Sequence, residues 1–207
     1  MNKFNVLALT AAIALSFSLP SAFADSSKKD AKSASLDLAA SHLKWTGKKV
    51  TGQHDGTLKL KSGKLEMNDK GEITGGDFVI DMTTIAVTDI KDPVDNKKLQ
   101  GHLMSPDFFN VEAHPEATFK ITSVKKMKSK SATHEITGEL TVKEKTEKIS
   151  FPVTVKMEKG MATAKGTLSV DRTKFDVRYG SGKFFENLGD KMISDNFDVA
   201  LDLKAKM

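Results

Sequence analysis

From Leu36 onward, apolar and polar side chains alternate with a period of two. In the segment 197–204, four apolar residues at every second position are separated mainly by charged ones. The same alternation occurs in the segments 58–61, 64–67, 78–83, 117–122 and 148–155. Such a pattern places one side of a strand against an apolar interior and the other side in water. The chain is therefore expected to be all-β.

Short turn sequences separate these segments. Lys-Ser-Gly at 61–63, Asn-Asp-Lys-Gly at 68–71 and Glu-Lys-Gly at 158–160 are typical of tight turns. Gaps of this length predict antiparallel hairpins between strands that follow one another in the sequence. About eight strands at this regular spacing favour a single domain that is an up-and-down barrel or a sandwich.

Two segments interrupt the alternation. Residues 92–109 lose the period of two, and Leu99 and Leu103 predict a short helix that is broken by Pro106. Residues 171–190 begin as a strand and are expected to continue as a loop that carries Phe184 and Phe185.

The N-terminus has the features of an export signal. Lys3 precedes the uncharged apolar run 6–19, and Ala-Phe-Ala at 22–24 supplies the small residues of a cleavage site before Asp25. We therefore expect a signal peptide at 1–24, a polar flexible leader at 25–34 and one folded domain at 35–207. No later segment approaches the length of a transmembrane helix, so the mature protein is expected to be exported and soluble.

Composition excludes several classes of protein. The chain has no cysteine, which rules out disulfides, thiolate metal sites, cysteine nucleophiles and a lipoprotein anchor. A net charge of +5 is small for 207 residues, and basic residues are not interleaved with aromatic ones as in binders of single-stranded nucleic acid. We therefore expect no nucleic-acid partner.

No catalytic, cofactor or metal motif stands out. The five histidines lack the spacing of a zinc site, and the chain has no nucleophile elbow, phosphate-binding loop or dinucleotide fingerprint. If the protein were an enzyme that acts on lipids, His102 and Asp107 would be the candidate acid and base. We expect instead that it is not an enzyme and that it needs no cofactor or metal.

Several segments resemble the YceI-like family. Residues 99–110 (LQGHLMSPDFFN) followed by 114–119 (HPEATF) are similar to its central signature. Residues 136–142 (ITGELTV) are similar to its next strand, and 171–175 (DRTKF) to a late segment of the family. The resemblance extends from about Leu36 to the C-terminus. Asp176 stands where the family often has glycine.

The resemblance implies an extended, lipocalin-like antiparallel barrel of eight strands with a short helix, exported to the periplasm. It also implies binding of a polyisoprenoid, a prenyl quinone or another long-chain amphiphile such as a fatty acid inside the barrel, and it brings no catalytic residues. An apolar interior can bind such a chain without specific polar contacts, because each buried CH₂ contributes about 0.8 kcal/mol. The sequence leaves open which lipid binds and whether the barrel forms a homodimer.

For a ligand of this class, the apolar lining is expected from the interior faces of the strands, the short helix and the late loop. The lining candidates are Trp45, Leu58, Leu60, Phe78, Ile80, Met82, Leu103, Phe108, Phe119, Ile121, Phe151, Val153, Phe175, Phe184, Phe185 and Phe197. A head group is expected to meet His102, Arg172 or Arg178, although the two arginines are better explained by salt bridges to Asp171 or Asp176.

Two other functions remain open. The interior could be filled by side chains, and the protein could then be an envelope interaction or stress protein that binds a partner through the loop carrying Phe184 and Phe185. That pair could equally plug the barrel. The lipid-acting enzyme with His102 and Asp107 is the remaining alternative.

Overall fold

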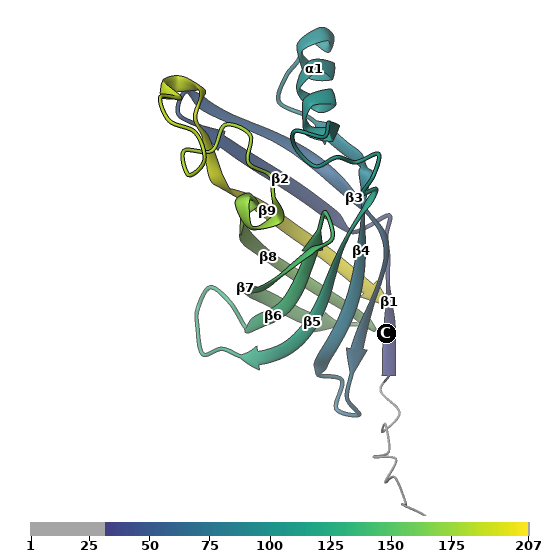
Figure 1. Ribbon diagram of the computed structural model, residues 1–207. Coiled ribbons are helices and arrows are strands. Elements are labelled where there is room, and N and C mark those ends of the chain that lie inside the picture. The colour runs from purple at the N-terminus through teal and green to yellow at the C-terminus, as the bar shows by residue number, and fades with distance from the viewer. Residues whose placement is uncertain (1–31, 207) are drawn as a thin grey trace, which may run out of the picture.

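The computed structural model describes residues 32–206, and the expected signal peptide and most of the leader lie outside them. The elements in chain order are β1 (Lys32–Leu36), β2 (His42–Lys49), β3 (Gly52–Met67), β4 (Ile73–Val87), α1 (Pro93–Met104), β5 (Glu116–Lys126), β6 (His134–Val142), β7 (Lys145–Glu158), β8 (Met161–Asp171), η1 (Arg172–Phe175), η2 (Gly189–Lys191) and β9 (Ile193–Lys206) (Figure 1). No helix among these residues is long and apolar enough to span a bilayer.

The strands form one antiparallel sheet that closes on itself. Neighbours run in the order β3-β2-β9-β8-β7-β6-β5-β4, and β4 pairs again with β3. Successive strands from β3 onward pair with one another, as expected from the turns at 68–71 and 158–160. The turn predicted at 61–63 is wrong, because Ser62 and Gly63 pair with β4 inside the continuous strand β3 and cause only a shift of register after Leu60. The structure therefore confirms the predicted single antiparallel barrel of eight strands, and of the two architectures left open it is the barrel rather than the sandwich.

The ninth strand does not enlarge the barrel, because β1 and β2 share one position in its wall. Both pair antiparallel with β3 on one side and with β9 on the other. The segment between β1 and β2, residues 37–41, is hydrogen-bonded to Lys204 of β9, whose carbonyl oxygen accepts from the Asp37 amide at 2.8 Å. The Lys204 amide in turn donates to Ser41 Oγ at 3.0 Å.

The start of β1 corrects one expectation. Residues 32–34 were expected to belong to the flexible leader, but they form the first part of β1. Ala34 and Leu36 are buried between β3 and β9, and this burial stabilises the strand. Two apolar residues in five are too few to produce a recognisable alternation, so the sequence did not reveal this strand.

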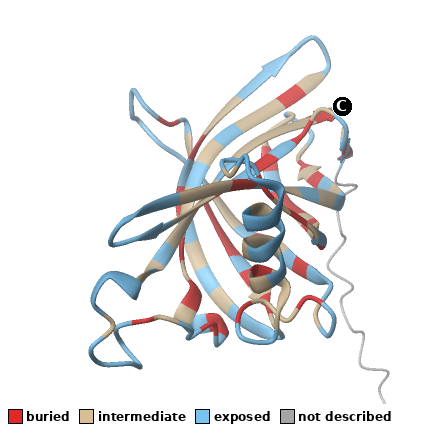
Figure 2. Cartoon of the chain, turned by 90° about the horizontal axis from the view of Figure 1, so that it is seen from above, coloured by how far each residue is buried: buried red, intermediate tan, exposed pale blue. Residues whose placement is uncertain are grey.

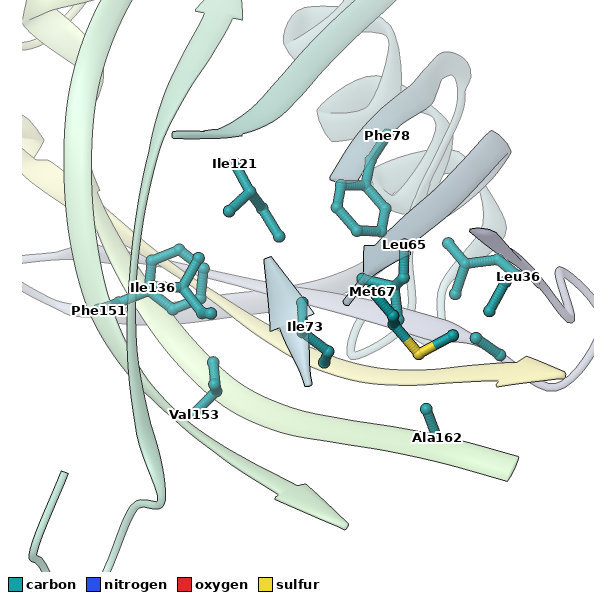
Figure 3. Close-up of a cluster of buried hydrophobic side chains, with 12 residues drawn as sticks. Leu36, Leu65, Met67, Ile73, Phe78, Ile121, Ile136, Phe151, Val153 and Ala162 are labelled. Carbon is teal, nitrogen blue, oxygen red and sulfur yellow. The ribbon is translucent and has the colours of Figure 1, made fainter. Parts of the chain in front are cut away.

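The barrel core consists of three clusters along its length. The cluster farthest from α1 contains buried side chains from every strand except β2, and those labelled in Figure 3 point inward toward one another. The middle cluster centres on Val170 and Phe175, and the third includes Trp45, Leu103 and Val177 near α1. Buried apolar side chains therefore occur along the whole length of the barrel.

The helix predicted within 92–109 is confirmed as α1. Asp92 caps its first turn by accepting from the amides of Val94 and Asp95, and Ser105 ends it directly before Pro106. Leu103 is its one buried residue. Seen from above, α1 lies in front of the strands that form the barrel wall (Figure 2).

The segment after β8 lies at the same end of the barrel as α1. Asp171 ends β8 and caps η1, and the chain then forms a loop through η2 to β9. Asp176, where the YceI-like family often has glycine, ends η1 with a φ of 62°. Aspartate is one of the residues that adopt this left-handed conformation, so the substitution preserves the backbone that glycine would provide.

Candidate functional site

The barrel encloses an inner chamber of about 150 Å³. Its lining is entirely apolar and comes from β2 to β9 together with Phe109. The lining residues are Leu43, Leu58, Leu60, Leu65, Ile73, Phe78, Ile80, Met82, Phe109, Ala117, Phe119, Ile121, Ile136, Leu140, Val142, Phe151, Val153, Val155, Ala164, Leu168, Val170, Phe197, Val199, Leu201 and Leu203. Such a chamber can bind a hydrocarbon chain but offers no side-chain hydrogen bond.

Phe119 is central to the wall of this chamber. Its ring centroid lies 6.4 Å from that of Phe78 and 5.8 Å from that of Phe151. It packs directly on Gly138 of the neighbouring strand, where a Cβ would overlap the ring. The absent side chain at Gly138 therefore provides the space that the Phe119 ring occupies.

A larger outer cleft of about 730 Å³ lies at the end of the barrel near α1. Unlike the chamber, it combines apolar and polar side chains. Its lining comprises Trp45, Gly47, Lys48, Lys49, His54, Leu58, Ile85, Asp95, Lys98, Leu99, His102, Leu103, Phe108, Phe109, Arg172, Tyr179, Ile193, Ser194 and Phe197. The cleft is thus bounded by β2, β3, α1 and the start of β9.

The cleft and the chamber adjoin at a neck. Leu58, Phe109 and Phe197 line both spaces. The Phe109 and Phe197 ring centroids are 6.2 Å apart, and Phe109 also meets Phe108 edge-on at 5.2 Å. A long molecule with one polar end could therefore place its chain in the chamber and its polar end in the cleft.

Trp45 forms part of the cleft wall on β2. Its side chain is 7 % exposed, and its ring lies against Gly56 of β3, where a Cβ would overlap the indole. Its Nε1 atom is buried and has no hydrogen-bond partner among residues 32–206. A buried donor without a partner costs about 1–3 kcal/mol, so this nitrogen is a notable feature of the wall.

His102, on α1, also lines the cleft. Its ring packs edge-on against Tyr179 at 4.5 Å and against Phe108 at 5.5 Å between centroids. Its Nε2 atom is also buried and unpartnered in the described part of the chain. His102 is thus held by aromatic contacts, and this nitrogen has no protein partner.

Arg172 lines the cleft but is committed to the protein backbone. Its guanidinium is 2 % exposed and donates to the carbonyl oxygens of Val177 at 2.8 Å, Ser194 at 2.9 Å and Ile193 at 3.1 Å. Burial lowers the pKa of Arg172, and the charge of Asp195 partly opposes this. Arg172 therefore joins η1 to the start of β9.

Charges in the cleft are unevenly compensated. Lys48 and His54 each contact an aspartate, at 3.3 and 2.9 Å. Lys49, Lys98 and Asp95 form no ion pair within residues 32–206. Two cations and one carboxylate are therefore left to interact with whatever occupies the cleft.

Most of the residues proposed from the sequence as lining lie around the two spaces. Eight line the chamber, three line the cleft, and Leu58 and Phe197 line both. Phe175 is buried in the middle cluster and reaches neither space. Phe184 and Phe185 are 45 % and 50 % exposed on the loop and line neither space.

The three head-group candidates are also separated. His102 and Arg172 line the cleft, whereas Arg178 does not. Arg178 forms an ion pair with Asp176 at 2.7 Å and lies over the Phe184 ring at 4.8 Å. The salt bridge considered for Arg178 is therefore present.

The structure does not bring together His102 and Asp107, the candidate acid and base of an enzyme. Asp107 is exposed, lines neither space and makes no hydrogen bond with His102 in the described chain. No group of three or more histidine, aspartate or glutamate side chains among residues 32–206 is arranged to hold a metal ion.

Sequence reasoning missed the polar part of the cleft. Lys49, Lys98 and Tyr179 were not proposed, although all three line it. They come from a hairpin end, a helix and a loop, which only the closed barrel brings together. Phe109 was visible in the sequence signature, but its position at the neck was not.

One family of proteins matches nearly the whole described part of the chain. A sequence model described as the YceI-like domain matches residues 34–205. No protein with a curated functional description matches the sequence.

Solved structures share the fold. BcnA of Burkholderia cenocepacia is 24 % identical, with a TM-score of 0.66 over 83 % of this chain and 99 % of that one. A domain from Saccharophagus degradans, described as polyisoprenoid-binding and implicated in plant cell wall breakdown, is 15 % identical, with a TM-score of 0.59 over 84 % and 97 %. A YceI protein of Campylobacter jejuni is 15 % identical, with a TM-score of 0.50 over 66 % and 74 %.

Proposed function

The chain belongs to the YceI-like family, and from this we propose that it binds and carries a long-chain amphiphile in the periplasm without altering it chemically. The ligand class is a polyisoprenoid, a prenyl quinone or a similar lipid. Its hydrocarbon chain lies in the chamber, and its polar end lies in the cleft.

The observation that carries this proposal is the connection between the two spaces. A wholly apolar chamber adjoins, at Leu58, Phe109 and Phe197, a cleft with polar side chains. This order matches a molecule with an apolar tail and one polar end. The polyisoprenoid-binding description of the Saccharophagus degradans domain supports the same ligand class.

Two parts of the proposal have other support. Periplasmic location rests on the signal features of residues 1–24 and on the family. Binding without catalysis rests on the separation of His102 from Asp107 and on a chamber that has no polar side chain to act on a ligand.

The test is mass spectrometry of an organic extract from the protein purified from periplasm. We expect about one prenyl lipid per chain, and none from an unrelated exported barrel. Phe119→Asp should abolish retention, because it places a charge in the apolar chamber. Thr118→Asp on the same strand is the matched control, since Thr118 is exposed and does not line the chamber.

Folding of both variants is checked by circular dichroism. If a folded Phe119→Asp protein kept the lipid, the chamber would not be the binding site. If the extract of the unaltered protein stayed empty after incubation with prenyl alcohols, quinones and fatty acids, the barrel would instead be a filled interaction module.

A further inference from the structure

Two nitrogen atoms in the walls of the cleft are buried without a hydrogen-bond partner among the residues that the structure describes. They are Nε1 of Trp45, on β2, and Nε2 of His102, on α1. Both side chains line the same cleft, beyond the neck that leads to the chamber. Buried polar groups in folded proteins nearly always have a partner, so two such atoms in one cleft need an explanation.

The protein itself does not supply that explanation. The Trp45 ring is fixed against Gly56, and the His102 ring is packed between Tyr179 and Phe108. The nearby Arg172 offers only donors, three of which are already bonded to carbonyl oxygens. Arg172 therefore has no lone pair that could accept a hydrogen bond from either nitrogen.

We propose that Trp45 and His102 form a head-group site that recognises an acceptor oxygen on the polar end of the bound lipid. Indole Nε1 can only donate a hydrogen bond, and imidazole Nε2 donates in one of its tautomers. The matching group on the ligand must therefore accept, as a quinone carbonyl or a phosphate oxygen does. This inference rests on the proposed function, because the tail in the chamber brings the head group into the cleft.

The head-group site would distinguish lipids by their polar end, whereas the apolar chamber contacts only the hydrocarbon tail. A hydrocarbon without oxygen would leave both nitrogens buried and unpartnered. A ligand with an acceptor oxygen would satisfy them and would bind more tightly for the same tail. Lys49 and Lys98 line the same cleft, and they add attraction only when the acceptor is an anion.

The experiment compares three short probes: farnesene, which has no oxygen, ubiquinone-2, which has carbonyl acceptors, and farnesyl phosphate, which is anionic. Binding is measured by calorimetry on the unaltered protein and on Trp45→Phe and His102→Phe. Both replacements remove the nitrogen and keep an aromatic ring. His42→Phe is the matched control, because it replaces a histidine on the same strand as Trp45 that is exposed and lines neither the cleft nor the chamber.

We expect His102→Phe and Trp45→Phe each to weaken the binding of ubiquinone-2 by roughly threefold to tenfold. The binding of farnesyl phosphate should weaken by more, because hydrogen bonds to charged groups are stronger. Farnesene binding should change by less than about twofold, and His42→Phe should leave the binding of all three probes nearly unchanged. Without ligand, His102→Phe should not lower the melting temperature, because it removes an unpartnered nitrogen.

Two results would overturn the inference. One is an equal loss for farnesene and ubiquinone-2, which would show that the rings act by packing alone. The other is unchanged binding of all three probes in both variants. Failure of the proposed function looks different, because then none of the probes, farnesene included, would bind the unaltered protein. A Lys49→Gln, Lys98→Gln variant should weaken the binding of farnesyl phosphate alone, because the two lysines attract only an anionic head group.

Discussion

The two arginines near the cleft have opposite surroundings although they are six residues apart. Arg172 is buried and donates to three backbone carbonyl oxygens, whereas Arg178 is exposed and pairs with Asp176. Replacing Arg172 leaves three carbonyl groups without their donors, whereas replacing Arg178 removes only a surface ion pair. The first is expected to matter for stability and the second is not.

Arg172→Met should therefore lower the free energy of unfolding by about 3 kcal/mol or more. Arg178→Met should change it by less than about 0.5 kcal/mol. Urea denaturation of both variants measures the difference, and hydrogen exchange should show the loss at 177–194, which Arg172 holds. Equal stability of the two variants would contradict this structural role.

At the residue scale, the sequence predicted inward-facing strand residues better than loop residues. Phe119 and Phe151 could be assigned to the interior because strand geometry alternates side chains strictly. Phe184 and Phe185 could not be placed, because a loop has no such period, and they are exposed. The buried state of Arg172 depends on carbonyl groups from β9, which no local pattern reveals.

At the scale of elements, Lys183 holds the loop before β9 through two ion pairs. Lys183 donates to Asp171 at 2.8 Å and lies 3.5 Å from Asp195. Burial alone would raise the pKa of Asp171, but hydrogen bonds from Lys183 and Thr173 outweigh it and hold this pKa below its usual value. The hydrogen bond from Lys183 to Asp171 in turn raises the pKa of Lys183.

The sign of the resulting pH dependence follows from the lowered pKa. Ionised Asp171 stabilises the folded state fully above its pKa in the unfolded chain, near 3.8, and this contribution is lost as the pH falls through the lower folded value. Asp171→Asn should thus cost about 1 kcal/mol at pH 7 and progressively less below pH 4. Urea unfolding of the unaltered protein and of Asp171→Asn between pH 3 and pH 7 measures this loss of stability, and Glu147→Gln, which removes another surface ion pair, is the control. A loss that stays constant at all pH values would contradict the role of ionised Asp171.

The helix and the interrupted strand show where element prediction succeeds and stops. The bounds of α1 are marked by Asp92, Pro93 and Pro106, whose backbone and capping preferences act locally. The short β1 exists because β3 and β9 leave room beside β2, and no local signal marks it. Tertiary pairing therefore determines what local preference does not.

For the whole molecule, the closed barrel was predictable and the space inside it was not. Alternating strands joined by short turns leave few ways to bury their apolar faces. The volume that remains depends on how rings such as Phe119 seat on residues such as Gly138, which a periodic pattern does not encode. The division into a chamber and a cleft likewise depends on where Phe109 meets Phe197.

If the chamber holds the tail, its depth should limit chain length. Ala164 on β8 lines the chamber but not the cleft. Ala164→Phe should fill that part of the chamber and exclude isoprene units from it. Each buried CH₂ contributes about 0.8 kcal/mol. Exclusion of one isoprene unit should therefore weaken the binding of long prenols by at least roughly tenfold and leave the binding of C10 prenol nearly unaffected.

A series of prenols from C10 to C40, titrated with Trp45 fluorescence as the reporter, measures this limit, since Trp45 is the sole tryptophan and lines the cleft. Thr163→Phe is the control, because Thr163 adjoins Ala164 on β8 and does not line the chamber. A limit that moves in both variants would reflect damage to β8. A limit that moves in neither would mean that the tail does not reach Ala164.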